Sequence, residues 1–438
     1  MTMLARALPA ASLAARLLGD RFAGDVHLPG QDGYDRARRP LYAFDPRPAL
    51  VVEAAGAEDV QAAVIAAHES GLPLVVQGTG HGTHVPCDGA LLLRTSSLTG
   101  VAVDARRGTA RTGCGARWGR VLDAAAPFGL APLSGSSRDV GVTGYTLGGG
   151  LGWLSRRYGF AADSLLRARV VTADGRLVTA SADNEPDLFW ALRGGGGNFG
   201  VVTQLEFRLH PVREVYAGSA CFPAETAGEV LARYRDWIGH IPDELSTAIV
   251  LTPAPEEAWV PASLRGRRVV MIKAVYAGAA DRARSLLRPL WRAAGRVLAE
   301  DFRTMPYAAA SMGGTAPGQV HLFTGLPDEV VEAVTATPSV AVEVRHWGGA
   351  MSRPEPGAGP AGHRNTSLSV IVDDEAPALA AALRPHATGG SFLNFLHDCS
   401  RTATAYTPED FGRLRKVKAV YDPGNVFGGG HVIPPAGA

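Results

Sequence analysis

The chain has 438 residues, which is enough for two domains with sizeable hydrophobic cores. Its 43 Lys and Arg residues nearly balance 42 Asp and Glu residues, so that the formal net charge is +1, and no polybasic run occurs. This balance argues against a nucleic acid or an anionic membrane surface as a partner. No apolar stretch is long enough to span a bilayer.

The N-terminal residues 1–20 are rich in Ala and Leu, but Arg6, Pro9 and Arg16 interrupt the apolar runs. We expect an amphipathic surface helix here, with a processed leader as the alternative. The four cysteines show no CxxC spacing, which argues against a zinc site and a disulfide framework. We therefore expect free thiols, no metal and a cytoplasmic protein.

From residue 49 the pattern alternates between strand and helix. Residues 49–56 are apolar and β-branched, residues 57–71 have helical spacing, and residues 72–77 form a second strand that ends at Gly78. A hairpin-like run over residues 91–115 and a helix over residues 116–129 follow. This half of the chain therefore begins like a βαβ unit.

A strand pair is expected around residues 170–180, and the composition changes at Pro211. Beyond Pro211 the patterns predict longer strands and a helix, which lie at 245–253, 267–278, 279–295 (the helix), 339–349 and 366–375. The C-terminal residues 418–435 look like a tail that returns to the first half.

Three glycine clusters occur in the first half, at residues 78–82, 148–152 and 194–197. Each could be a simple turn, but together they suggest a long phosphorylated cofactor that lies against the backbone where a Cβ would collide. His81 lies inside the first cluster; a lone histidine is more often structural, yet in such a turn its ring can approach a ligand. The segment 148–153 resembles GxGxxG only loosely, so we reject a standard dinucleotide fold.

Four segments together resemble the FAD-linked oxidases of the vanillyl-alcohol oxidase superfamily, in particular the berberine-bridge-enzyme-like branch of bacteria. They are QGTGHGTH (77–84), DVGVTGYTLGGGLGWLSRRYG (139–159), DLFWALRGGGGNFGVVT (187–203) and RLRKVKAVYDPGNVF (413–427). They occur in the family's order and extend over most of the chain.

The resemblance implies an α+β fold: a two-part FAD-binding domain of the PCMH type, and a substrate domain with a large antiparallel sheet and flanking helices. The implied parts are an N-terminal segment that packs on the FAD domain (1–42), the FAD domain (43–212), the substrate domain (213–405) and a berberine-bridge-like segment that returns to the FAD domain (406–438).

The resemblance also assigns cofactor contacts. His81 stands where the family bonds covalently to the 8α-methyl of the flavin, a reaction that suits a neutral ring nitrogen. The other implied contacts are Gln77, Gly78, Thr79, Gly80, Gly82, Thr83, His84, Ser137, Gly141, Gly144, Tyr145, Gly149, Gly150, Gly152, Val202, Asn425 and Phe427.

Two positions indicate how the flavin is attached and which electron acceptor is used. Ser137 stands where many members have a cysteine that makes a second covalent bond, and a hydroxyl does not replace a thiolate there. We therefore expect one bond, through His81. Val140 stands at the family's oxygen gate, where a valine implies that O₂ is the electron acceptor and H₂O₂ the by-product.

A general base is harder to place. In the family the strand after a His-Arg pair carries a polar catalytic group; here the pair is His363-Arg364, and counting puts Val370 and Val372 at the polar positions. The family's Y-x-N-Y is FLNF, so that Asn394 is kept while Phe392 and Phe395 lack the hydroxyl groups. The remaining polar candidates are Tyr145, Glu343, Arg345 and His346, and strand alternation places Glu343 and Arg345 on the face opposite to His346.

We expect an FAD oxidase whose flavin is covalently attached through a histidine. Its expected substrate is a small aromatic or apolar secondary metabolite, such as an amine, a phenol or a hydroquinone. Tyr145, Asn394 and Val140 are the residues we assign to the catalytic centre. A small-molecule substrate and O₂ are the expected partners, in a monomer or a homodimer. The alternatives are a drug-binding or resistance flavoprotein and a flavin-dependent cyclase without net oxidation.

Overall fold

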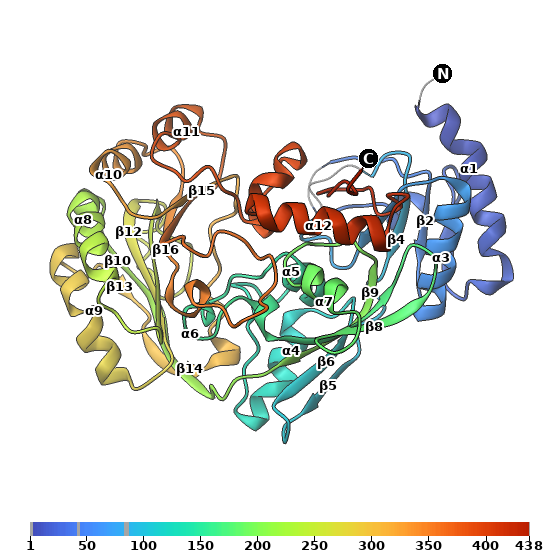
Figure 1. Ribbon diagram of the computed structural model, residues 1–438. Coiled ribbons are helices and arrows are strands. Elements are labelled where there is room, and N and C mark those ends of the chain that lie inside the picture. The colour runs from blue at the N-terminus through green and yellow to red at the C-terminus, as the bar shows by residue number, and fades with distance from the viewer. Residues whose placement is uncertain (1–2, 42–43, 83–86, 438) are drawn as a thin grey trace.

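Two lobes divide the protein, as the computed structural model shows for residues 3–41, 44–82 and 87–437 (Figure 1). The first lobe holds two small sheets, and the second holds one large sheet. The chain passes from the first lobe to the second near Pro211 and returns through the C-terminal helix.

The first sheet of the first lobe has four strands in the order β1-β2-β4-β3. The strands are β1 (Asp25–His27), β2 (Leu50–Glu53), β3 (Leu74–Gln77) and β4 (Leu91–Arg94). The helix α3 (Ala57–Ser70) connects β2 to β3, which confirms the predicted βαβ start. β4 is parallel to β2 and β3 and lies between them.

The hairpin predicted for residues 91–115 is therefore only half right. Leu91, Leu92 and Leu93 are all buried, since a strand covered on both faces reads as a continuous apolar run and belongs inside a parallel sheet. Only β5 (Val101–Asp104) and β6 (Thr109–Gly113) form the hairpin.

The second sheet of the first lobe is antiparallel, in the order β5-β6-β9-β7-β8. Its remaining strands are β7 (Leu165–Val171), β8 (Leu177–Ser181) and β9 (Val201–Arg208). The predicted strand pair at residues 170–180 is the β7–β8 hairpin. One face packs against helices and forms a core around Trp118 and Phe207; the helices are α4 (Trp118–Ala125), α5 (Val142–Leu147) and α7 (Pro186–Leu192).

The large sheet of the second lobe has eight strands, and its pairs are antiparallel. They are β10 (Glu214–Pro223), β11 (Leu245–Pro253), β12 (Arg268–Tyr276), β13 (Ala299–Glu300), β14 (Arg303–Pro306), β15 (Gln319–Phe323), β16 (Val342–His346) and β17 (Leu368–Val372). The strands predicted at 245–253, 267–278, 339–349 and 366–375 correspond to β11, β12, β16 and β17.

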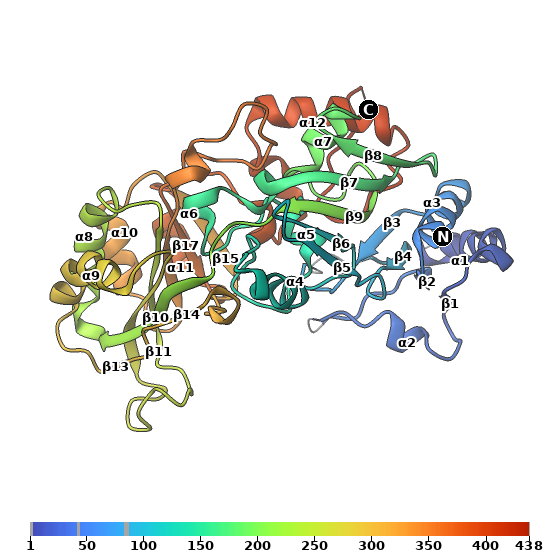
Figure 2. The same ribbon diagram turned by 90° about the horizontal axis from the view of Figure 1, so that it is seen from below.

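Four helices cover the outer face of this sheet (Figure 1). They are α8 (Ala227–Ile238), α9 (Ala280–Ala294, the predicted helix), α10 (Asp328–Thr335) and α11 (Pro377–Leu383). Val342 and Val344 of β16 belong to the core beneath these helices. Because side chains alternate along a strand, Glu343 and Arg345 lie on the opposite face, which is turned toward the first lobe (Figure 2).

The C-terminal segment joins the first lobe, as predicted. Its helix α12 (Pro408–Tyr421) lies beside α7, and the backbone N–H of Leu74 then donates to the carbonyl of Val426 at 2.8 Å. The fully buried side chains of Lys418 and Asp422 form an ion pair, with Nζ 2.6 Å from Oδ2. The tail is thereby fastened to the edge strand β3.

The N-terminal residues form the helix α1 (Met3–Leu18), which packs on α3. The two other short helices are α2 (Tyr34–Ala37) and α6 (Ser155–Tyr158). Within the described part of the chain, no helix combines the length and apolar character that crossing a bilayer requires.

Candidate active site

The glycine turn after β3 presents His81. The turn begins where β3 ends, at Gln77, and Gly80 has a φ of 86°, which favours glycine. The side chain of Thr79 lies 3.4 Å from His81, between Oγ1 and Nδ1. A Cβ on Gly82 would meet no atom of the described residues within 4 Å. The two predicted contacts that follow, Thr83 and His84, lie outside the described residues.

The surroundings of His81 keep its imidazole neutral. Its pKa is lowered first by burial and then by the positive charge of Arg117, while Asp139 acts in the opposite direction. A neutral ring has a free nitrogen lone pair, which is the form that can attack an electrophilic carbon. The lowered pKa of His81 therefore favours this neutral form of its ring.

A second loop, residues 135–141, lies directly against this turn. A Cβ on Gly141 would come 2.9 Å from Oγ1 of Thr79, so that the two motifs pack together at a glycine. The hydroxyl of Ser137 accepts from the backbone N–H of Asp139 at 3.3 Å. The carbonyl of Val140 accepts from the N–H of Trp118 at 3.0 Å. The helix α5 starts after Gly141, and its Gly144 has no neighbour within 4 Å of a built Cβ.

Tyr145 lies on α5 with its ring wedged among glycines. A Cβ would come 2.5 Å from the ring at Gly150, 2.9 Å at Gly135 and 3.2 Å from the hydroxyl at Gly152. Burial raises the pKa of Tyr145 well above its ordinary value. Its hydroxyl oxygen is buried and, among the described residues, has no hydrogen-bond partner.

Asn394 connects the two lobes at the same loop. Its Oδ1 accepts from the backbone N–H of Gly150 at 2.8 Å, and its Nδ2 donates to the carbonyl of Tyr145 at 3.1 Å. A Cβ on Gly148 would come 2.5 Å from Nδ2 of Asn394, and one on Gly149 would come 3.0 Å from the ring of Phe392. Both ends of the Asn394 amide therefore hold backbone, which makes it a positioning residue for Tyr145.

The glycine clusters thus have two explanations. In the clusters at residues 148–152 and 194–197, most of the close contacts are with protein: at Gly194 a Cβ would lie 2.4 Å from the backbone of Ala361. At Gly144 and Gly197 a Cβ would meet no atom of the described residues within 4 Å, whereas at Gly78 it would come 3.4 Å from the carbonyl oxygen of Cys114. The cofactor explanation therefore applies to single glycines and not to whole clusters.

The remaining implied contacts lie in two settings. Val202 and Phe427 are buried in the cores of the first lobe, with 4% and 3% of their surface exposed. Asn425 has a φ of 52° and a buried Oδ1 without a partner among the described residues. Their contact with a cofactor stays a prediction.

On the large sheet, the structure selects between the polar candidates. His346 faces the helices: its Nε2 lies 2.8 Å from Nη1 of Arg156, and Tyr234 is its ring neighbour. Val370 and Val372 also belong to the helix-side core, so that the count that placed them at the polar positions was wrong by one residue. Alternation instead puts Ser369 and Ile371 on the face toward the first lobe.

Glu343 and Arg345 are the polar groups of β16 that face the first lobe. The guanidinium of Arg345 lies 4.4 Å from the ring centroid of Trp153, and its Nη1 is 3.5 Å from the hydroxyl oxygen of Ser136. Oε2 of Glu343 accepts from the N–H of Thr315 at 3.0 Å. The loop of residues 135–141 therefore reaches from the neighbourhood of His81 to that of Arg345.

These features fit a bound flavin. The room beside Gly144, the half-buried imidazole of His81 with its lowered pKa, and the buried hydroxyl of Tyr145, which has no hydrogen-bond partner among the described residues, lie on the turn after β3 and on α5, whose N-cap Gly141 packs against that turn. Buried polar atoms without partners are rare in folded proteins, so that a bound molecule is the simplest source of partners for them.

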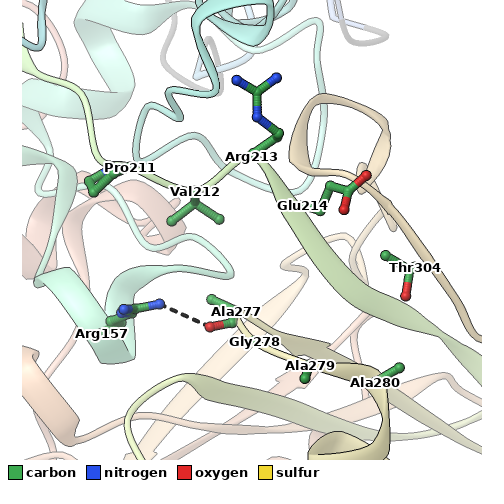
Figure 3. A pocket seen from close by; sticks show the side chains of 10 residues that line it. All are labelled: Arg157, Pro211, Val212, Arg213, Glu214, Ala277, Gly278, Ala279, Ala280 and Thr304. Carbon is green, nitrogen blue, oxygen red and sulfur yellow. Dashed lines mark hydrogen bonds between the residues drawn. The ribbon is translucent and has the colours of Figure 1, made fainter.

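A separate cavity of about 340 Å³ lies at the junction of the lobes (Figure 3). The side chain of Arg157 donates to the carbonyl of Ala277 at 2.9 Å at its edge. The other residues that line it are Pro211, Val212, Arg213, Glu214, Gly278, Ala279, Ala280 and Thr304. None of the predicted site residues is among them, so this cavity is distinct from the candidate active site.

One group of potential metal ligands occurs among the described residues, on β1 and β2. Asp25, His27 and Glu53 offer ligand atoms within 4.8 Å of one another. Arg94 lies 3.6 Å from Glu53, between Nε and Oε1, so that the carboxylate already has a cationic partner. We assign no metal to this group.

Two protein-family models match parts of this chain. The FAD-binding domain matches residues 48–181, and the berberine and berberine-like domain matches residues 391–434. A curated relative from Dictyostelium discoideum, named an FAD-linked oxidoreductase, is 28% identical over 89% of each chain. The protein is an FAD-dependent oxidoreductase.

Further relatives extend over nearly the whole of this oxidoreductase. The (R)-6-hydroxynicotine oxidase of Paenarthrobacter nicotinovorans is 29% identical over 95% of this chain and 97% of that protein. The crystal structure of 6-hydroxy-D-nicotine oxidase from Arthrobacter nicotinovorans superposes with a TM-score of 0.80 at 27% identity, and covers 94% of this chain and 98% of that one. The predicted α+β fold, with its large antiparallel sheet, is confirmed.

Proposed function

We propose that this oxidoreductase is an oxidase that carries FAD on His81, oxidises a small aromatic or apolar metabolite, and passes the electrons to O₂ with release of H₂O₂. The observation that carries the proposal is the environment of His81. Its ring is half-buried, its pKa is lowered so that the neutral form is favoured, and it lies in a glycine turn that packs at Gly141 against the loop of residues 135–141.

A single covalent bond is the expected arrangement. Ser137 stands where many members of the resembled family have the cysteine that makes a second covalent bond to the flavin. Its hydroxyl oxygen accepts a hydrogen bond from the backbone N–H of Asp139. Cys114 does not offer a substitute, because burial raises the pKa of its thiol to about 11 and so disfavours the reactive thiolate.

The residues of the chain would divide the work as follows. When bound, the flavin supplies a two-electron acceptor. His81 and the backbone of residues 77–82 would hold it, and Asn394 keeps Tyr145 in place beside it. Val140, at the end of the loop that carries Ser137, is the residue we assign to oxygen access.

The substrate class is narrowed by the strands that face the first lobe. β17 offers no carboxylate on that face, whereas β16 offers Glu343. A relative's name gives 6-hydroxynicotine as its substrate, which supports a small aromatic compound, and amines and phenols or hydroquinones are the classes we propose. A carboxylate near the substrate can take a proton as the substrate is oxidised.

The proposal is tested by acid precipitation of the purified protein. Flavin absorbance should remain with the pellet of the wild type and of the control Ser137→Ala, and should move to the supernatant for His81→Ala. Free flavin from the wild type would contradict the covalent bond, and a protein without flavin would contradict the cofactor itself.

Turnover tests the oxidase. Peroxide release under air with amines or hydroquinones is the expected result. Stable binding of a compound without turnover would indicate a sequestering protein instead. A rearranged product without peroxide would indicate a cyclase.

A further inference from the structure

We propose that Glu343, Arg345 and Lys273 form the group that recognises the substrate, and that they select an ionisable hydroxyl group, as in a phenol or hydroquinone, rather than an amine. The inference rests on the proposed function, since it names the substrate class of that same site.

The register of the large sheet brings these side chains together. Ala248 of β11 is the partner of Arg345 on β16 and of Lys273 on β12, so that the two cations lie in one row with only a methyl group between them. Adjacent strands are about 4.8 Å apart, which puts the two backbones roughly 10 Å apart. Glu343 precedes Arg345 by two residues on the same face.

All three groups are buried, with exposed fractions of 1% for Glu343, 5% for Arg345 and 8% for Lys273. They influence one another: burial lowers the pKa of Lys273, the negative charges of Glu343 and of the exposed Glu257 raise it, and Arg345 lowers it. The group thus holds two basic side chains beside one buried carboxylate, and Nζ of Lys273 donates to the carbonyl of Met312 at 3.1 Å. A buried cation is costly unless a group of opposite charge or a hydrogen-bond acceptor compensates it.

The hydrogen bonds of the group are also incomplete. Nη2 of Arg345, Nε1 of Trp153, the hydroxyl of Tyr145 and Oε1 of Glu343 are buried and have no partner in the part of the chain that the structure describes. The ion pair inside the group is loose, with 3.8 Å between Nη1 of Arg345 and Oε1 of Glu343. The unpartnered set therefore offers several donors and one carboxylate acceptor.

This set matches a hydroxyl group that loses its proton. Oε1 of Glu343 accepts the proton, the O–H bond breaks with its electron pair left on the substrate oxygen, and the resulting oxyanion lies against the Arg345 guanidinium. The total charge is unchanged, since the carboxylate becomes neutral as the oxyanion forms. A protonated amine would instead add a third cation beside Arg345 and Lys273, which Coulomb repulsion opposes.

The test uses 4-nitrophenol, whose phenolate has its own absorption band, and 4-nitrobenzylamine as a cationic counterpart. We expect the full-length protein to bind 4-nitrophenol as the phenolate at a pH where the free compound is mainly protonated. 4-Nitrobenzylamine should bind at least tenfold more weakly. Equal binding of the amine, or binding of 4-nitrophenol without the phenolate band, would overturn the inference.

Variants locate the effect. Arg345→Gln should weaken 4-nitrophenol binding at least tenfold and remove the phenolate band, and Lys273→Met should act in the same direction. Arg345→Lys keeps the charge and should restore part of the binding, which separates charge from folding. The control Arg353→Gln removes an exposed arginine that pairs with Asp243 and should change nothing. Unchanged binding in both Arg345→Gln and Lys273→Met would overturn the inference.

Glu343 is tested by its amide variant. In Glu343→Gln, oxidation of methylhydroquinone should fall at least tenfold, and bound 4-nitrophenol should no longer show the phenolate band, because the amide cannot accept the proton. Selective binding of 4-nitrobenzoate over 4-nitrophenol would show that the site takes a permanent carboxylate, and would overturn the phenol assignment. If the protein binds the phenolate but contains no flavin, only the oxidase proposal is contradicted. If the protein contains flavin but does not bind the phenolate, only this inference is contradicted.

Discussion

The side chain of Asn394 holds the backbone of Gly150, with Oδ1 of Asn394 accepting from the Gly150 N–H at 2.8 Å across 244 residues of sequence. The same amide donates to the carbonyl of Tyr145. A side chain from the C-terminal part of the chain thus sets the position of a tyrosine whose ring lies among the glycines of the first lobe.

Replacing Asn394 by Ala should leave one N–H and one C=O without a side-chain partner. We expect the free energy of unfolding to fall by about 1–3 kcal/mol, because buried polar groups without partners cost this much. Asn394→Asp keeps the acceptor for Gly150 but sets a carboxylate oxygen against the carbonyl oxygen of Tyr145, so that it should also destabilise the protein. Urea denaturation measures both variants; wild-type stability in either one would contradict this role of the amide.

The conformation of Gly150 makes a prediction about the loop around Tyr145. Its φ is +80°, and a Cβ would lie 2.5 Å from the Tyr145 ring and 2.7 Å from Ala161. Gly150→Ala should therefore destabilise the protein by roughly 2 kcal/mol or more. Gly412→Ala is the matched control, because Gly412 lies in α12 with no atom within 4 Å of a built Cβ and should tolerate Ala. Thermal denaturation of the two variants would contradict this account if they behaved alike.

The buried ion pair of Lys418 and Asp422 should be essential for holding the C-terminal tail against the first lobe. The carboxylate of Asp422 also accepts from the backbone N–H groups of Val426 and Phe427, at 2.7 and 3.0 Å. Lys418→Met leaves a buried unpaired carboxylate, for which we expect a loss of about 3–5 kcal/mol. In the double variant Lys418→Met/Asp422→Asn the uncompensated charge is absent, and part of the loss should be regained. A double-mutant cycle by chemical denaturation measures this coupling, and simple additivity would argue against it.

His210 should make stability depend on pH. Burial, with the positive charges of Arg208 and Arg157, lowers its pKa from 6.5 to about 4. Between these two values the unfolded chain binds a proton that the folded chain does not, so the free energy of unfolding falls as the pH decreases through this window.

His210→Phe keeps a ring to stack on Tyr158, which lies 4.0 Å away between ring centroids, but it cannot titrate. The advantage of the wild type over this variant should therefore shrink as the pH is lowered from about 6.5 to about 4. Denaturation curves at several pH values measure the difference. A difference that is independent of pH would contradict the assigned shift.

Much of the site was predictable from sequence, because its information is local. The turn that carries His81 requires glycine within a few residues of a strand end, and the resemblance of four ordered segments gave the α+β fold and the cofactor. The alternation of Glu343 and Arg345 against His346 also followed from the two-residue period of a strand.

The direction of each face could not be predicted, since it depends on which layer covers the sheet. The helices α8–α11 bury Val370 and His346 on one side and leave Glu343 and Arg345 facing the first lobe. A count along one strand that is wrong by one residue reverses every side chain, as happened for Val370 and Val372.

Sequence alone predicted most of the elements and the motifs, because periodicity and turn residues are properties of neighbouring residues. Only the tertiary structure decided that Asn394 holds Gly150 and that Ala248 separates Arg345 from Lys273. Those contacts join residues that are far apart in the chain, and strand register and packing between the two lobes bring them together.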